Sequence, residues 1–251
     1  MNTSLNKTCK LRTDGIFKNY EGMPILDNIS IELYENEFVS ILGPSGCGKS
    51  TLFNIISGLD TPESGTYYID GEESAGKLGK VSYMHQKDLL LPWKKIIDNL
   101  AIPMVIKGVS KKEAREEAAK YLGTFGLEGF GDKYPNQLSG GMKQRAALLR
   151  AYLFSSNIML LDEPFGALDS ITRSKMHYWL LNVVKKLNTS ILFITHDIEE
   201  AILLSDRIYV LSERPARVKD EIRVEFEGER NKDIITSPEF NQIKKRIMDN
   251  L

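Results

Sequence analysis

A stretch of nine residues, "GPSGCGKST" at 43–51, has the composition of a loop that could hold a polyphosphate. Gly43, Gly48, Lys49 and Ser50 fit the pattern G-x-x-x-x-G-K-S/T between an apolar run and a helical segment. Glycines let backbone N–H groups turn toward phosphate oxygens, and the following helix adds its positive end. Lys49 would reach the β and γ phosphates, and the Ser50 hydroxyl would bind Mg²⁺. A plain glycine-rich turn is the alternative, but the motif with its flanks favours a nucleoside triphosphate.

Two carboxylates follow the apolar residues of "IMLLDEP" at 158–164. Four consecutive apolar residues are typical of a strand buried on both faces, and open α/β sheets bind ligands at the carboxyl ends of their strands. Asp162 would hold Mg²⁺, and Glu163 would act as general base for the attacking water. Pro164 favours an extended backbone at Glu163. The alternative is an acidic pair that is simply solvated at a strand end.

A second candidate anion site is "LSGGMKQR" at 138–145, where Ser139, Gly140 and Gly141 precede or begin a helix. Ser139 could merely cap the helix and the glycines could merely form a turn. One nucleotide has one triphosphate, however, and 43–51 already provides a loop for it. If both segments serve the same γ-phosphate, two chains must face one another, each contributing this segment to the other's nucleotide.

The elements that must position these residues alternate between short apolar runs and helical patterns, which predicts βαβ units and a mainly parallel sheet. Strands are expected over 29–33, 38–42, 66–70, 80–84, 158–161, 191–195 and 207–211. Helices are expected over 49–59, 96–108, 110–122 and 142–154. Ser110 and Glu113 have the spacing of a capping box. Because no strand is expected between the helices of about 96–155, these predict a separate inserted helical lobe.

Composition limits the classes of function. Hydrophobic residues make up 42% and charged residues 27% of the 251 residues, which is typical of a globular protein. The formal net charge of −1 provides no field for collecting nucleic acid. Two cysteines, Cys9 and Cys47, are too few for a disulfide framework or a zinc site. The start "MNTSLNKTCK" lacks the apolar core of a signal peptide, and no apolar run approaches the roughly 18 residues of a membrane span.

With these motifs in order along one chain, the sequence resembles the ATP-binding cassette (ABC) ATPases, and "LSGGMKQR" carries the resemblance most specifically. The resemblance extends from about residue 11 onward. It implies an α/β fold with a RecA-like P-loop core, an antiparallel β lobe and an inserted helical lobe. We therefore expect one domain over 1–251, with the core and β lobe in 1–95 and 156–251 and the helical lobe in 96–155.

The resemblance also implies roles for individual residues. Gln86 in "YMHQKD" resembles the glutamine that senses Mg²⁺ and the γ-phosphate, and His196 in "ITHD" resembles the histidine that contacts the γ-phosphate. Asp169 ends "GALD", which resembles the loop that crosses the dimer interface, and Tyr20 lies where the family stacks an aromatic ring on adenine. Taken alone, His196 and Tyr20 would more often be ordinary packed or surface residues.

The resulting candidate site also includes residues outside the three motifs described first. The residues expected to bind ATP are Tyr20, Gly43, Pro44, Ser45, Gly46, Cys47, Gly48, Lys49, Ser50, Thr51, Ser139, Gly140, Gly141 and Asp169. Those expected to act in hydrolysis are Lys49, Gln86, Glu163 and His196, and those expected to bind Mg²⁺ are Ser50, Gln86 and Asp162. Cys47 is expected to fill space in the loop, since no base is identifiable beside it.

Finer resemblance is to ATPase subunits of importers for nitrate, sulfonate, taurine and thiamine-precursor compounds, and implies a homodimer on the cytoplasmic face of a membrane permease. An extracytoplasmic binding protein would select the solute, and no nucleic acid would be bound. The apolar run within 86–95 would contact the permease, although such runs are mostly core. A soluble ABC-type ATPase acting in DNA repair or on ribosomes is the alternative, but those usually carry long coiled-coil insertions or two cassettes. A P-loop kinase would leave "LSGG" and His196 unexplained.

Overall fold

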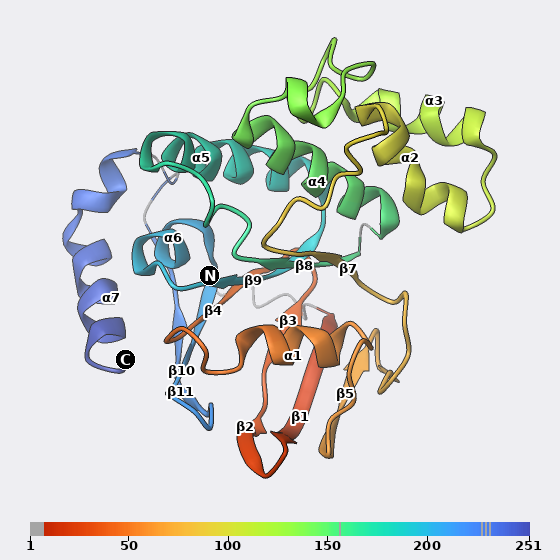
Figure 1. Ribbon diagram of the computed structural model, residues 1–251. Helices are drawn as coiled ribbons and strands as arrows, with labels where there is room; N and C mark the ends of the chain where they lie inside the picture. Colours follow the sequence, from red (N-terminus) through yellow and green to blue (C-terminus); the bar gives the residue numbers. More distant parts are fainter. Residues whose placement is uncertain (1–7, 156, 227, 229, 231) are drawn as a thin grey trace. The chain divides into compact units, whose positions relative to one another are not determined.

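The computed structural model describes residues 8–155, 157–226, 228, 230 and 232–251. These residues fall into two compact units, which we call the first unit (up to Val81 and from Thr189) and the second unit (Ser82–Asn188). The second unit is larger than the helical lobe expected over 96–155, since it also contains one strand that precedes those helices in the sequence and one that follows them (Figure 1). Among the helices of the described residues, none has the length and apolar character needed to cross a membrane.

The first unit contains a sheet whose strands are mostly parallel. Its strands are β4 (Phe38–Leu42), β9 (Ser190–Thr195), β10 (Arg207–Leu211) and β11 (Val218–Arg223), in the order β11, β10, β4, β9. β4 pairs in parallel with both β9 and β10, and β11 is antiparallel to β10. Every residue of β4, β9 and β10 is buried, as expected for apolar runs covered on both faces. Three of the strands expected from apolar runs are therefore confirmed.

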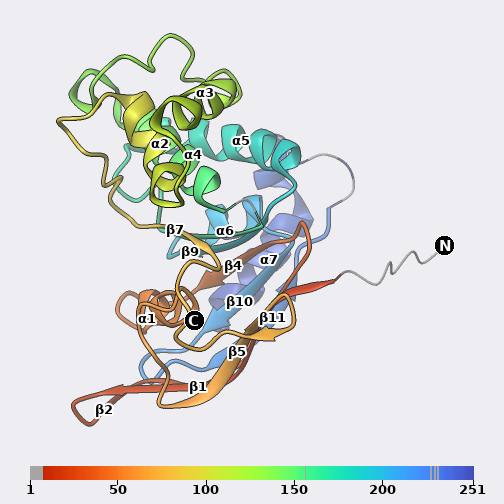
Figure 2. The ribbon, with the colours of Figure 1, turned by 90° about the vertical axis from the view of Figure 1, so that its right-hand side faces the viewer.

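A second group of strands in the first unit is antiparallel (Figure 2). Its strands are β1 (Cys9–Tyr20), β2 (Met23–Ile29), β3 (Glu32–Tyr34), β5 (Ser64–Ile69) and β6 (Glu72–Glu73). The single strand expected over 29–33 is wrong, because Ile29 ends β2 and β3 begins later. The buried Thr13 hydroxyl donates to the Ile29 carbonyl (3.1 Å) and accepts from the Ile31 N–H (2.9 Å). The Thr13 side chain thus bonds the backbone on both sides of the interruption between β2 and β3.

The second unit consists of two parallel strands and several helices. They are β7 (Ser82–Met84), α2 (Ile96–Ile106), α3 (Lys111–Tyr121), the 3₁₀ helix η1 (Pro135–Gln137), α4 (Gly140–Phe154), β8 (Ile158–Asp162) and α5 (Ser170–Leu187). None of residues 96–154, all of which are described, lies in a strand. Only half of the expected capping box is present: the Ser110 hydroxyl caps α3 by accepting from the Glu113 N–H (3.3 Å), but the Glu113 carboxylate accepts from the Ser110 hydroxyl (2.6 Å) and not from its backbone N–H. α3 buries only Ala114 and Ala118, four residues apart, which is why it can carry many charges elsewhere.

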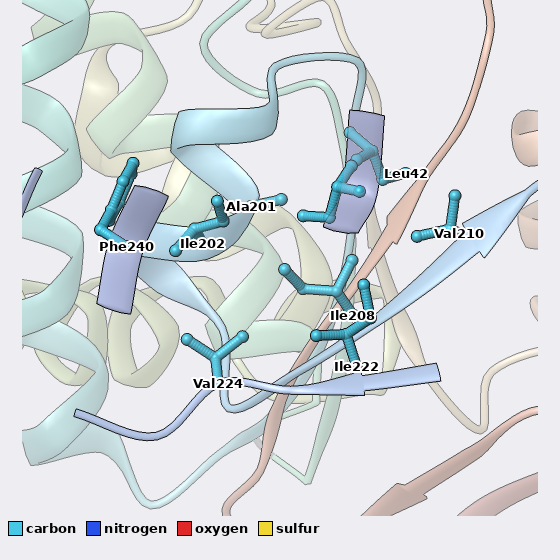
Figure 3. Close-up of a cluster of buried hydrophobic side chains, with 9 residues drawn as sticks. Leu42, Ala201, Ile202, Ile208, Val210, Ile222, Val224 and Phe240 are labelled. Carbon is cyan, nitrogen blue, oxygen red and sulfur yellow. The ribbon is translucent and has the colours of Figure 1, made fainter. Parts of the chain in front are cut away.

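An apolar cluster of the first unit joins its sheet to the C-terminal helix (Figure 3). The helices that contribute to it are α6 (Ile198–Leu204), η2 (Lys232–Thr236) and α7 (Pro238–Met248), whereas α1 (Lys49–Ile56) contributes no residue. Phe240 and Ile247 of α7 are fully buried in this cluster with residues of α6, β10 and β11. Burying each such side chain contributes about 1.5–3 kcal/mol. Leu42, the residue before the glycine-rich loop, belongs to the same cluster, so the loop starts from a well-packed strand.

Candidate nucleotide site

The glycine-rich loop of 43–51 leaves the buried strand β4 and enters α1 at Lys49. Gly46 and Gly48 have positive φ angles of 77° and 126°, which a residue with a side chain adopts only with strain. The Lys49 ammonium is buried and donates to the carbonyls of Gly43 (2.8 Å) and Pro44 (2.9 Å). The loop therefore already holds a cation at its centre. Phosphate oxygens would replace these carbonyls as acceptors, so the geometry fits the expected ligand.

Packing beneath the loop also requires glycine. A Cβ atom on Gly48 would lie 2.8 Å from Leu26 Cδ2 and 2.9 Å from Ile25 Cγ2. A Cβ atom on Gly43 would lie 3.1 Å from the Cβ atom of Leu211. Above this packed base, Ser45, Gly46 and Ser50 are exposed, whereas Cys47 is buried. The exposed side of the loop is therefore the side available to a ligand.

His196 follows the strand that pairs with β4, since Leu42 and Thr195 are partners in the parallel ladder. The loop and His196 thus leave the sheet at the same end. The Thr195 hydroxyl accepts from the Asp197 N–H (3.0 Å) and is hydrogen-bonded to the buried Glu200. Asp197 in turn caps α6 by accepting from the Glu200 N–H (3.1 Å). These bonds hold the backbone on both sides of the exposed His196.

Arg214 is a residue of this site that sequence reasoning missed. It lies in the turn after β10, the other parallel neighbour of β4, and one Nη atom donates to the Gly46 carbonyl. Its other Nη atom lies 3.4 Å from the Met23 sulfur. Arg214 therefore connects the glycine-rich loop to the hairpin in which Tyr20 pairs with Met23. No local pattern indicates this, because Arg214 and Gly46 are 168 positions apart.

Tyr20 ends β1 and presents a partly exposed ring, 44% accessible. Its hydroxyl donates to the Asp60 carboxylate, and Lys18 Nζ lies 5.0 Å from the ring centroid. Burial raises the pKa of Tyr20, and the bond to Asp60 raises it further. Lys18 donates to the same carboxylate (2.7 Å), so the ring is held in place by its hydroxyl and flanked by a cation. A partly exposed, oriented ring of this kind is suited to stacking on a base.

In the second unit, two carboxylates at the end of β8 receive hydrogen bonds from β7 and from the residues that follow it. The Tyr83 hydroxyl donates to Asp162 Oδ2 (3.1 Å), and Gln86 Nε2 donates to Glu163 Oε2 (3.3 Å). Asp162 is buried and Glu163 is half-buried. Burial raises the pKa of Tyr83, and the negative charge and hydrogen bond of Asp162 raise it further. Tyr83 therefore stays a protonated donor toward this carboxylate.

The extended backbone expected at Glu163 is wrong, because its φ angle is 42°. The Gly166 N–H donates to the Glu163 carbonyl (3.1 Å), so residues 163–166 form a tight turn. Pro164 occupies the second position of that turn, where its fixed φ is favoured. The preference of a residue before proline for extended structure is therefore outweighed by the turn. A left-handed non-glycine residue costs about 1–3 kcal/mol, and such strain is often found at functional sites.

The segment 138–145 begins α4, and the Ser139 hydroxyl caps the helix by accepting from the Met142 N–H (3.4 Å). A Cβ atom on Gly140 would lie 3.2 Å from Leu168 Cδ2, and one on Gly141 would lie 3.2 Å from Thr172 Cγ2. The two glycines therefore allow α4 to approach the start of α5. Ser139 and Gly140 are exposed in the chain, so they are accessible to a further molecule.

Asp169 caps α5 by accepting from the Thr172 N–H (3.0 Å), and this hydrogen bond lowers the pKa of Asp169. Arg173, one turn further along α5, donates to the Leu168 carbonyl (3.0 Å). The loop "GALD" is thereby held by its own following helix. Arg173 is a second positioning residue that the motif alone did not indicate, since it lies outside the matched letters.

The apolar run within 86–95 is divided between core and surface. Leu90 is only 7% exposed, whereas Leu89 and Trp93 are 54% and 71% exposed. Arg150 of α4 donates to the carbonyls of Asp88 (2.6 Å) and Leu89 (2.7 Å), which holds the run from the helix side. Leu90 therefore belongs to the core, whereas the exposed side chains of Leu89 and Trp93 remain available to contact another protein.

The donor set suits Mg²⁺. Of the expected ligands, the Ser50 hydroxyl lies in the first turn of α1 in the first unit. The Gln86 amide and the buried Asp162 carboxylate lie in the second unit. Oxygen donors with few carboxylates match a Mg²⁺ ion that keeps waters and phosphate oxygens as its remaining ligands. Zinc or another soft metal would require cysteine or histidine ligands. Among the described residues, no cluster of three or more histidines, cysteines or acidic residues suggests such a metal.

Comparison with known proteins identifies a matching family, similar sequences and a similar solved structure. The profile of the ABC transporter family matches residues 26–166. The formylaminopyrimidine import ATP-binding protein ThiZ of Halalkalibacterium halodurans is 47% identical, over 80% of this chain and 78% of its own length. The nitrate import ATP-binding protein NrtD of Synechocystis is 42% identical, over 88% of this chain and 86% of its own length. A dimeric cassette, MJ0796, solved with ADP and phosphate, superimposes with a TM-score of 0.72 and 32% identity, covering 86% of this chain and all of the other.

Proposed function

This chain belongs to the ABC transporter ATP-binding family, and we propose that it is the ATPase subunit of an importer for a small organic or anionic solute. Relatives named as import subunits for formylaminopyrimidine and nitrate support import of a solute of this kind. The same names favour transport over the alternative of a soluble ATPase acting in DNA repair or on ribosomes. The observation that carries the proposal is the glycine-rich loop with the buried Lys49 ammonium at its centre.

ATP binding is assigned to Tyr20, which stacks on adenine, and to residues 43–51, which bind the phosphates. Lys49 exchanges its hydrogen bonds to the Gly43 and Pro44 carbonyls for bonds to the β and γ phosphates. Those carbonyls already offset part of the free-energy cost of burying the ammonium. The loop therefore needs little reorganisation when the phosphates bind. His196, whose backbone is held by Thr195 and Asp197, contacts the γ-phosphate.

Hydrolysis is assigned to Glu163, which accepts a proton from the attacking water. The hydrogen bond from Gln86 orients the Glu163 carboxylate, and the turn at 163–166 sets the direction of its side chain. Ser50, Gln86 and Asp162 would hold Mg²⁺. The ion, when bound, neutralises negative charge that develops on the transferred phosphoryl group.

Two copies of the chain act together in this proposal. Ser139, Gly140, Gly141 and Asp169 of one copy act on the nucleotide of the other. Exposure of Ser139 and Gly140 supports this, because a helix N-terminus with accessible N–H groups favours an anion. The dimeric cassette solved with ADP and phosphate supports it as well. The permease is contacted through the exposed side chains of 86–95, on the cytoplasmic face of the membrane, and an extracytoplasmic binding protein delivers the solute.

The proposal is tested by Glu163→Gln. We expect this variant to bind ATP but to hydrolyse it roughly 10²–10⁴-fold more slowly, the usual contribution of a general base. Retained ATP should then hold two copies together, which size-exclusion chromatography with Mg-ATP would detect. Glu128→Gln, at an exposed glutamate in a turn of the second unit, is the matched control and should hydrolyse ATP normally.

The outcomes separate the parts of the proposal. Near-normal turnover by Glu163→Gln would remove Glu163 from the role of base. Failure of the unmodified protein to bind ATP would contradict the proposed function as a whole. Failure to co-purify with a permease expressed from the same organism would contradict the transport role.

A further inference from the structure

We propose that Tyr83 is a positioning residue that sets the affinity of Asp162 for Mg²⁺. This inference rests on the proposed function, in which Asp162 is a ligand of the ion. Tyr83 lies in the segment "YMHQKD" that carries Gln86, but the sequence alone assigns no role to it. Its hydroxyl donates to Asp162 Oδ2 at 3.1 Å, although the two residues are 79 positions apart.

The pairing of two strands produces this contact. β7 and β8 run in parallel, and Tyr83 is the partner of Leu160 in the ladder. Asp162 is the last residue of β8, two positions beyond that partner, so the long phenol side chain must lean along the strand direction to reach it. The hydroxyl then meets the carboxylate at the strand end, where the ion would be bound.

A hydrogen bond to Oδ2 restrains rotation of the Asp162 carboxylate about its Cβ–Cγ bond. Groups that orient a metal ligand in this way typically change metal affinity or activity about 10–100-fold when they are removed. The bond joins a neutral donor to a carboxylate that is 8% exposed, so water competes with it poorly. Tyr83 therefore affects Mg²⁺ through the orientation of its ligand and does not touch the ion.

His85 restrains Tyr83 in turn. The two rings stack with centroids 4.0 Å apart and planes 29° apart. His85 is exposed and directly precedes Gln86, so the phenol ring is covered on one face by the segment that carries the proposed Mg²⁺-sensing amide. The end of β7 thus directs one donor to each carboxylate, Tyr83 to Asp162 and Gln86 to Glu163.

The test measures how strongly nucleotide binding depends on Mg²⁺. The fluorescent nucleotide mant-ATP is bound to the intact protein first in EDTA and then in a titration of free Mg²⁺. For Tyr83→Phe we expect an unchanged dissociation constant in EDTA and a Mg²⁺ midpoint that is about tenfold higher. The phenylalanine keeps the ring and its stacking on His85, so only the hydroxyl is removed. Tyr121→Phe, on α3 of the same unit, is the matched control and should keep the original midpoint.

A second pair of variants keeps the inference testable if Tyr83→Phe folds poorly. His85→Ala should raise the Mg²⁺ midpoint, because the phenol ring loses its cover, and His85→Phe should restore it. A purely structural role would instead raise the dissociation constants in EDTA and in Mg²⁺ together. Midpoints for Tyr83→Phe and His85→Ala equal to that of the unmodified protein would overturn the inference. Absence of mant-ATP binding in the unmodified protein would instead contradict the proposed function.

Discussion

Gly48 is required by packing as well as by backbone conformation, and comparing alanine at this position with alanine at two other glycines separates the two effects. Its φ of 126° would strain an alanine by about 1–3 kcal/mol. The added Cβ atom would also lie 2.8 Å from Leu26 Cδ2, and Leu26 is completely buried and cannot move aside freely. Overpacking of this kind costs about 1–3 kcal/mol. Alanine stabilises relative to glycine by about 0.4–1 kcal/mol through the unfolded chain, which leaves a net loss of about 1–5.6 kcal/mol.

Two other glycines supply the matched controls. Gly46 lies in the same loop with φ 77°, and the nearest atom to an added Cβ would be Arg214 Nη2 at 3.9 Å. Gly71 lies outside the loop with φ 79° and nothing within 4 Å of an added Cβ. Alanine at either position introduces strain without a clash. We therefore expect each to lose about 0–2.6 kcal/mol, which is less than the loss for Gly48→Ala by the overpacking cost of about 1–3 kcal/mol.

Urea unfolding followed by circular dichroism measures the three losses, and mant-ATP binding measures the effect on the loop. Gly48→Ala should show the largest fall in the unfolding midpoint, and Gly71→Ala should bind mant-ATP normally. A loss of stability for Gly48→Ala no greater than that for Gly46→Ala and Gly71→Ala would refute the packing argument. The glycine would then be required by backbone conformation alone.

Two further predictions concern residues outside the motifs. Arg214→Ala should weaken ATP binding about 3–10-fold, because a hydrogen bond to the loop is lost. Arg217→Ala, in the same turn, should leave ATP binding unchanged. Equal mant-ATP affinities for the two variants would contradict the role of Arg214. Trp93→Glu should keep the stability and basal ATPase activity of the isolated protein but reduce co-purification with a permease. Leu90→Glu should instead lower the urea midpoint, because it places a carboxylate in the core; a stable Leu90→Glu protein would show that this part of the segment is not core.

The parts of the fold that could be predicted are those whose signals are local. β4, β9 and β10 are mostly apolar runs, as expected for strands that are buried on both faces. The start of α3 was predictable from Ser110 and Glu113, which bond across one turn. The glycine-rich loop was recognisable because its backbone conformation and its cation come from neighbouring residues.

β1 and β2 were not predicted because their residues do not alternate cleanly. Thr13 and Lys18 of β1 are buried, at 1% and 9% exposure, although polar residues are expected at the surface. Lys18 is tolerated there because it donates to Asp60 (2.7 Å) and to the Thr61 carbonyl (2.8 Å). Those partners lie more than 40 positions away, so the pattern of β1 alone cannot reveal them.

The sequence by itself determined which chemistry this protein carries: the phosphate loop, the acidic pair at the end of β8 and the capped glycines of α4 are each set by residues within about one turn or one strand end. Tertiary structure decided how those groups are oriented. Tyr83 reaches Asp162 across 79 positions, Gln86 reaches Glu163 across 77, and Arg214 reaches Gly46 across 168. Local patterns encode backbone conformation and caps, because these depend on neighbours along the chain. Contacts across strand ends depend on which strands pair and in which register, and many distant residues set that pairing together.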